Sequence, residues 1–191
     1  MGKYMKKLLF KSQLEYGAYG ANICTPVCCI VGSNYLLHDS ENIRSVFSIA
    51  KMDSIMRVCH NMYAECFSKS RVNMMLADVQ KYFPTSIKMF EIAGMTISGE
   101  AETVEDLIVQ PFCDLLTNEL KAESSRAIIV TRLDHTICYL LDGKRGVLVF
   151  DPLEASIRDV SDSWNSTIPA KNTQYSGLIL TKQIEGDAAG V

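Results

Sequence analysis

The segment from Pro26 to Leu37 constrains the fold most, because it is apolar on nearly every side. Pro26 suits the first turn of a helix, where its missing N–H costs no hydrogen bond and its backbone angle is already helical. About three turns follow, and their apolar residues cover most of the helix circumference: Cys28, Cys29, Ile30, Val31, Tyr35, Leu36 and Leu37. A helix without a polar face needs partners all round. We therefore expect a buried core helix that begins near Cys24.

The rest of the chain has helix-like segments first and strand-like segments afterwards. Apolar residues three or four positions apart predict one amphipathic helix, or two, over 42–69, and shorter helices over 76–83 and 103–120. β-Branched and aliphatic runs between turn residues predict strands at 87–92, 127–131, 136–141, 147–150 and 178–181. This order predicts an α+β domain, with the helical part packed against a mostly antiparallel sheet.

Length and charge narrow the function classes. The chain has 191 residues, which suits a single domain over 1–183 followed by a flexible tail over 184–191. Its formal net charge is −3, and no basic cluster predicts a surface for nucleic acid. The apolar run at 8–10 is far too short for a signal peptide or a membrane span. We expect a monomer with neither nucleic acid nor a membrane as partner.

The chain has seven cysteines, an odd number, and they form neither a Cys-x-x-Cys pair nor a Cys/His spacing suited to zinc. We therefore expect free thiols and no metal or organic cofactor. Free thiols favour a reducing compartment, the cytoplasm or the nucleus, with delivery into a host cell as an open alternative.

Cys24 differs from the other cysteines because it ends a glycine-containing approach, Gly20-Ala21-Asn22-Ile23, to the start of the core helix. The helix macrodipole contributes roughly half a positive charge there, which favours a thiolate. A backbone amide at the same place can also donate to a substrate oxyanion. The other six cysteines lie in apolar periodic stretches and are interpreted as core thiols. Cys24 is the candidate nucleophile.

His135 opens the strand predicted at 136–141, and Asp151 closes the strand predicted at 147–150. A hairpin centred near Gly143 would place positions 135 and 151 opposite each other, with both side chains on the same face. A thiol nucleophile needs such a pair: an imidazole that exchanges its proton and a carboxylate that orients the imidazole. The alternative interpretation is a histidine held by Asp134 or Asp151 for stability alone.

The other histidines fit less well. His60 belongs to the amphipathic helix, and His38 lies at the far end of the core helix, some 20 Å from Cys24 at about 1.5 Å per residue. Asp134 would point to the opposite face of the strand from His135.

Gln13 and Asn22 precede Cys24 and carry side-chain amides that could act as oxyanion donors. One such donor is typically worth about 3 kcal/mol in the transition state. Gln13 suits the role better, because Asn22 could instead shape the turn. Gly20, with Gly17 and Ala21, suits a narrow substrate groove.

Gln13, the phrase Gly20-Ala21-Asn22-Ile23-Cys24 with its hydrophobic helix, and Val149-Phe150-Asp151-Pro152 resemble the herpesvirus tegument deubiquitinases, a papain-like group of cysteine peptidases. The resemblance implies a papain-like fold, with Cys24 as nucleophile, Gln13 as oxyanion donor and Asp151 as acidic partner. Two departures stand out. Asn22 replaces the Gln that precedes their cysteine, and Leu153 stands where their Asp-Pro-His phrase has its histidine. His135 takes its role from the ordinary papain-like arrangement instead.

The resulting expectation is a deubiquitinase: a cysteine protease that cleaves ubiquitin, polyubiquitin chains or a ubiquitin-like modifier at the carboxyl end, through a thioester on Cys24. One alternative is another papain-like thiol hydrolase or acyltransferase, such as an effector-type protease. A second is a non-catalytic binding module that uses the methionine-rich helix over 42–69, although a core-facing methionine stripe is the simpler interpretation.

Overall fold

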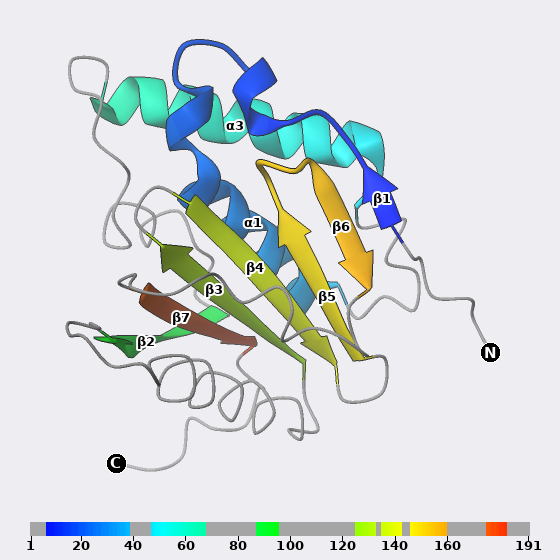
Figure 1. Ribbon diagram of the computed structural model, residues 1–191, viewed down its shortest axis with the longest axis vertical. Helices are drawn as coiled ribbons and strands as arrows, with labels where there is room; N and C mark the ends of the chain where they lie inside the picture. The colour runs from blue at the N-terminus through cyan, green and yellow to red at the C-terminus, as the bar shows by residue number, and fades with distance from the viewer. Residues whose placement is uncertain are drawn as a thin grey trace, which may run out of the picture.

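The computed structural model describes residues 7–38, 47–67, 87–95, 125–132, 135–142, 146–159 and 175–182. Seven strands form one sheet in the order β1-β6-β5-β4-β3-β7-β2, and all neighbours pair antiparallel (Figure 1). Their bounds are β1 (Lys7–Leu9), β2 (Ile87–Met95), β3 (Arg126–Arg132), β4 (His135–Asp142), β5 (Gly146–Asp151), β6 (Ser156–Asp159) and β7 (Tyr175–Lys182). Together with the helices, this sheet confirms the α+β prediction.

Helix α1 (Cys24–Leu37) lies against the sheet, and α3 (Ile49–Phe67) packs on α1 (Figure 1). Two short 3₁₀ helices, η1 (Gln13–Glu15) and η2 (Gly20–Asn22), precede α1. Gly32 permits a close approach of α1 to the sheet: a Cβ there would lie 3.0 Å from Ala127 Cβ and 3.1 Å from Leu180 Cδ1. The buried core helix expected from the apolar segment is confirmed.

The central strands β4 and β5 are buried on both faces. One set of alternating side chains joins α1 in the hydrophobic core, namely Cys138, Leu140, Leu148 and Phe150. The intervening set is buried as well, namely Ile137, Tyr139, Leu141, Val147 and Val149. A strand that is buried on both faces has a continuous apolar run rather than an alternating one. This is why both strands are easy to recognise in the sequence.

Other elements differ from the expectation in extent. The amphipathic helix is described over Ile49–Phe67, and its Met52, Met56 and Met62 are buried, as expected of a core-facing stripe. Strands β1 and β6 were not predicted, because they are only 3 and 4 residues long and contain charged residues. The helices expected at 76–83 and 103–120 and the tail at 184–191 lie outside the described residues.

No helix among the described residues is both long enough and apolar enough to cross a membrane. No group of three or more His, Cys, Asp or Glu side chains in the described ranges could hold a metal ion.

Candidate active site

Cys24 is the first residue of α1, and its side chain is buried, with 4% of its surface exposed. Ile23 precedes the helix and has no polar side chain with which to cap it. The first intrahelical bond runs from the N–H of Val27 to the carbonyl of Ile23, at 3.0 Å. The thiol of Cys24 therefore lies at the positive end of the helix dipole.

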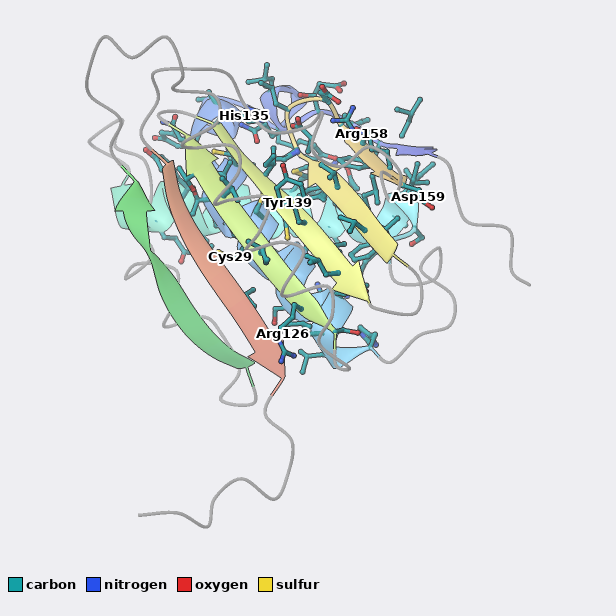
Figure 2. The ribbon with its side chains drawn as sticks, turned by 60° about the horizontal axis from the view of Figure 1, so that its bottom comes forward. Cys29, Arg126, His135, Tyr139, Arg158 and Asp159 are labelled. Carbon is teal, nitrogen blue, oxygen red and sulfur yellow. The ribbon has the colours of Figure 1, made fainter. Side chains whose placement is uncertain are left out.

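The first turn of α1 is joined to the start of β4. Thr25 Oγ1 lies 2.9 Å from Thr136 Oγ1, and Cys28 Sγ donates to the carbonyl of Thr136 at 3.3 Å. Cys24 directly precedes Thr25, and His135 directly precedes Thr136. These contacts therefore bring the start of α1 and the start of β4 to the same end of the sheet (Figure 1), and Figure 2 labels His135 at that end.

His135 Nε2 lies 3.3 Å from Asp151 Oδ2, within hydrogen-bonding distance. The imidazole is partly exposed and the carboxylate is buried. Oδ1 of Asp151 accepts the backbone N–H groups of Leu153 at 2.9 Å and Glu154 at 3.1 Å. Burial alone would raise the pKa of Asp151, but its contact with His135 and the hydrogen bonds from Glu154 and Leu153 outweigh burial and lower the pKa below its usual value.

The hairpin that carries this pair is centred one residue later than expected. Asp142 pairs with Gly146 and Cys138 pairs with Phe150, so one further step along this register sets position 151 opposite Ile137. The prediction that His135 and Asp151 lie directly opposite each other is therefore wrong. They are diagonal neighbours, two positions apart. Since side chains alternate in a strand, an offset of two residues keeps both on the same face, and the pair still forms.

Gln13 is 3% exposed and is held between the end of β5 and the approach to Cys24. Its backbone N–H donates to the carbonyl of Pro152 at 3.1 Å, and its Nε2 donates to the carbonyl of Ala21 at 3.4 Å. Ser12 Oγ, in the preceding residue, donates to the carbonyl of Leu153 at 3.0 Å. Gln13 Oε1 is buried and has no hydrogen-bond partner among the residues described.

Gly20 is buried directly against the backbone of Gln13. A Cβ at position 20 would overlap the carbonyl oxygen of Gln13 and lie 3.3 Å from Leu14 Cα. This close packing of η2 on η1 is a reason for glycine at this position, in addition to the groove expected from the sequence. Asn22 is half-buried, and its backbone N–H donates to the carbonyl of Tyr19 at 2.9 Å, so it forms part of the turn before α1.

The other described thiols are core residues. Cys28, Cys29, Cys59 and Cys138 are each 0% exposed, and burial raises the pKa of all four. A thiol with a raised pKa is a poor nucleophile near neutral pH. The core interpretation is therefore confirmed for these four, while the side chains of Cys66 and Cys113 lie outside the described part of the chain.

His38 follows the end of α1, and His60 lies in α3. His38 is exposed at the carboxyl end of α1, away from Cys24. His60 packs under the loop that leads to η2: its ring centroid lies 5.6 Å from that of Tyr19, and its Nε2 would lie 3.1 Å from a Cβ at Gly17.

A second set of contacts, not expected from the sequence, holds the segment before η2 against α3. Tyr16 donates its hydroxyl to Asp53 Oδ1 at 2.9 Å, and Arg57 Nε donates to Asp53 Oδ2 at 2.8 Å. Arg57 also lies over the Tyr16 ring, 5.9 Å from its centroid. Burial and the bond to Asp53 raise the pKa of Tyr16 to about 12. No local signal predicts this contact, because Tyr16 and Asp53 are 37 positions apart.

The chain is similar to known proteins in fold rather than in sequence. No protein-family model matches the chain, and no curated protein sequence matches it. Among solved structures, the fold is similar to the ubiquitin-specific protease encoded by murine cytomegalovirus tegument protein M48, determined in complex with a ubiquitin-based suicide substrate. The two share a TM-score of 0.61 and 16% sequence identity, over 97% of this chain and 90% of that one. At this identity the likeness establishes a shared fold.

Proposed function

We propose that this protein is a papain-like thiol hydrolase that cleaves ubiquitin or a ubiquitin-like protein at its carboxyl end. The observation that carries the proposal is the His135–Asp151 pair, 3.3 Å apart, at the end of the sheet where α1 begins with Cys24. A thiol at a helix start, an imidazole and a buried carboxylate are the three groups that acyl transfer through a thioester requires.

The proposed catalytic cycle gives the two ring nitrogens of His135 different roles. Asp151 engages Nε2 of His135, so the other ring nitrogen, Nδ1, is the one that exchanges a proton with Cys24. The Cys24 sulfur attacks the substrate carbonyl carbon and forms a tetrahedral oxyanion. The C–N bond then breaks, His135 returns the proton to the leaving amine, and a thioester remains. Water, deprotonated by His135, hydrolyses the thioester and regenerates the thiol.

Stabilisation of the oxyanion falls to Gln13 and to the backbone N–H of Cys24. Gln13 Nε2 has two N–H groups, and the carbonyl of Ala21 accepts from Nε2. In this proposal the second N–H donates to the oxyanion. Such a donor contributes roughly 3 kcal/mol to the transition state. Burial of Gln13 and the bond from its Nε2 to the Ala21 carbonyl hold the side-chain amide in one orientation, which is the preorganisation that this role needs.

The position of the proposed catalytic histidine differs from that in the group that the sequence resembles. Leu153, at the position of that group's histidine, is 42% exposed, and its N–H donates to Asp151. In this proposal β4 supplies the imidazole and β5 the carboxylate. The two roles are thus divided between neighbouring strands rather than carried by one phrase.

The choice of substrate draws on the M48 enzyme, which was determined with a ubiquitin-based substrate. We extend the proposed substrates to polyubiquitin chains. We also propose that the enzyme is a monomer. The buried free thiols fit a reducing compartment, the cytoplasm or the nucleus.

The test compares hydrolysis of ubiquitin carrying a carboxy-terminal aminocoumarin amide with hydrolysis of unrelated aminocoumarin peptides. We expect cleavage of the ubiquitin derivative, loss of that cleavage in Cys24→Ala, and retention in Cys59→Ala, which removes a core thiol from α3. Cleavage of the peptides alone would favour a general thiol hydrolase. An inactive wild type whose partner binding survives in Cys24→Ala would favour a binding module.

A further inference from the structure

Three threonine hydroxyls connect the helix that carries Cys24 to the strand that carries His135. Thr136 Oγ1 is the middle member: it lies 2.9 Å from Thr25 Oγ1 and 3.1 Å from Thr131 Oγ1. Thr136 is 0% exposed, whereas Thr25 and Thr131 are half-buried. The chain of hydroxyls therefore runs from the first turn of α1, across β4, to β3.

A hydroxyl at position 136 can form hydrogen bonds with both neighbouring threonines. Each threonine hydroxyl has one donor and two acceptor sites, so Thr136 can donate to one neighbour and accept from the other. A buried hydroxyl without partners would be costly, and a valine of nearly the same shape would fill this space without any polar group. The polar residue therefore needs a reason other than packing.

The residues that precede Thr25 and Thr136 in the sequence supply that reason. Thr25 directly follows Cys24, and Thr136 directly follows His135. The backbone carbonyl of Thr136 also accepts from Cys28, one helical turn beyond Cys24. These two contacts on Thr136 thus fix the position of the first turn of α1 relative to the start of β4. A misplacement of about 1 Å between reacting groups can reduce a rate by roughly 100-fold.

We propose that Thr136 is a positioning residue that holds the Cys24 sulfur in register with the imidazole of His135. It touches neither the substrate nor the reacting atoms, and it acts through Thr25 and its own neighbour in β4. This inference rests on the proposed function, because it assigns Cys24 and His135 as the reacting pair.

The test uses Thr136→Val, which keeps the shape and removes the hydroxyl, and Thr136→Ser, which keeps the hydroxyl. Ser33→Ala is the matched control, since it removes a buried hydroxyl from α1 further from Cys24. Three quantities are measured for each: the melting temperature, kcat and KM on the ubiquitin aminocoumarin substrate, and the rate at which iodoacetamide alkylates Cys24 at neutral pH, mapped by mass spectrometry.

We expect Thr136→Val to lower kcat and the alkylation rate by about tenfold or more while KM stays within about twofold, because positioning affects the chemical step. Thr136→Ser should restore both, and Ser33→Ala should change neither. Thr25→Val breaks the same hydrogen bond from the helix side, so it should give the same loss, and the double variant should lose little more. If Thr136→Val does not fold, Thr25→Val decides the question.

Wild-type kcat and alkylation rate in a folded Thr136→Val or Thr25→Val would overturn the proposal, as would a loss that Thr136→Ser does not restore. Alkylation requires no modifier protein. A wild type that cleaves no ubiquitin substrate would therefore contradict the proposed function, while the alkylation rates would still decide whether Thr136 positions Cys24.

Discussion

His135 Nε2 lies 3.3 Å from Asp151 Oδ2, although the two residues come from different strands and are offset by one diagonal step. The carboxylate is oriented by two backbone amides, from Leu153 and Glu154, which occupy its other oxygen. Asp151 therefore has one oxygen held by the backbone turn and one directed at the imidazole. Because the backbone holds the carboxylate, the carboxylate in turn holds the imidazole ring in one orientation. A fixed ring orientation favours efficient proton transfer.

Asp151→Asn tests the role of the charge. The asparagine oxygen can still accept from Leu153 and Glu154, so the turn should persist, whereas the charge that stabilises a protonated imidazole is lost. We expect kcat to fall by roughly 100-fold or more with little change in KM. Steady-state kinetics with far-ultraviolet circular dichroism checks this. A folded variant with wild-type kcat would refute a catalytic role for the carboxylate.

The same variant tests the pH dependence of stability. The pKa of Asp151 is lower in the folded protein than in an unfolded chain, where it is about 3.9. Its ionised form therefore stabilises the fold above about pH 4, and this contribution disappears as the pH falls through the lowered pKa. Urea unfolding at several pH values should show a wild-type advantage over Asp151→Asn near neutrality that shrinks in acid. An advantage that grows below about pH 4 would contradict the assignment.

A paired substitution at 135 and 153 identifies the general base. His135→Ala should lower kcat/KM by about 10³-fold or more, because it removes the group that exchanges the Cys24 proton. Leu153→Ala should leave kcat within about threefold, since that side chain is exposed and carries no titratable group. The two rate constants are compared on the same ubiquitin substrate. The opposite ranking would show that the region after Asp151 supplies the essential group.

Substitution of Gly20 and of Gly32 distinguishes an effect on the position of Gln13 from an effect on core packing. Gly20→Ala would force η2 away from Gln13, whereas Gly32→Ala would crowd Ala127 and Leu180 between α1 and the sheet. We expect each to cost about 1–3 kcal/mol of the free energy of unfolding. Only Gly20→Ala should also lower kcat, because it displaces the proposed oxyanion donor. Equal kcat values in both stable variants would argue against that role for Gln13.

The parts of the fold that could be predicted from the sequence are those with a strong local pattern. The core helix from Cys24 was predictable because no side of it is polar, and β4 and β5 because burial on both faces gives unbroken apolar runs. His135 and Asp151 could be paired because they sit at the ends of two strands joined by a short hairpin. Its register could not, because the pairing of Asp142 with Gly146 depends on turn geometry that composition does not determine.

Long-range contacts between polar residues were not predictable. Thr25 and Thr136 are 111 positions apart, and Tyr16 and Asp53 are 37 apart. Single threonine or tyrosine residues carry no periodic signal that would link such positions. The close approach of Gly20 to Gln13 likewise depends on how two 3₁₀ helices pack, and glycine in a loop is too common to predict it.

Reaction of the protein with ubiquitin bearing a carboxy-terminal electrophile, followed by mass spectrometric mapping of the adduct, tests directly whether Cys24 is the nucleophile. We expect one covalent adduct on Cys24, formed at a rate that falls sharply in His135→Ala and is unchanged in Cys59→Ala. No adduct, an adduct on another cysteine, or a rate independent of His135 would contradict this expectation.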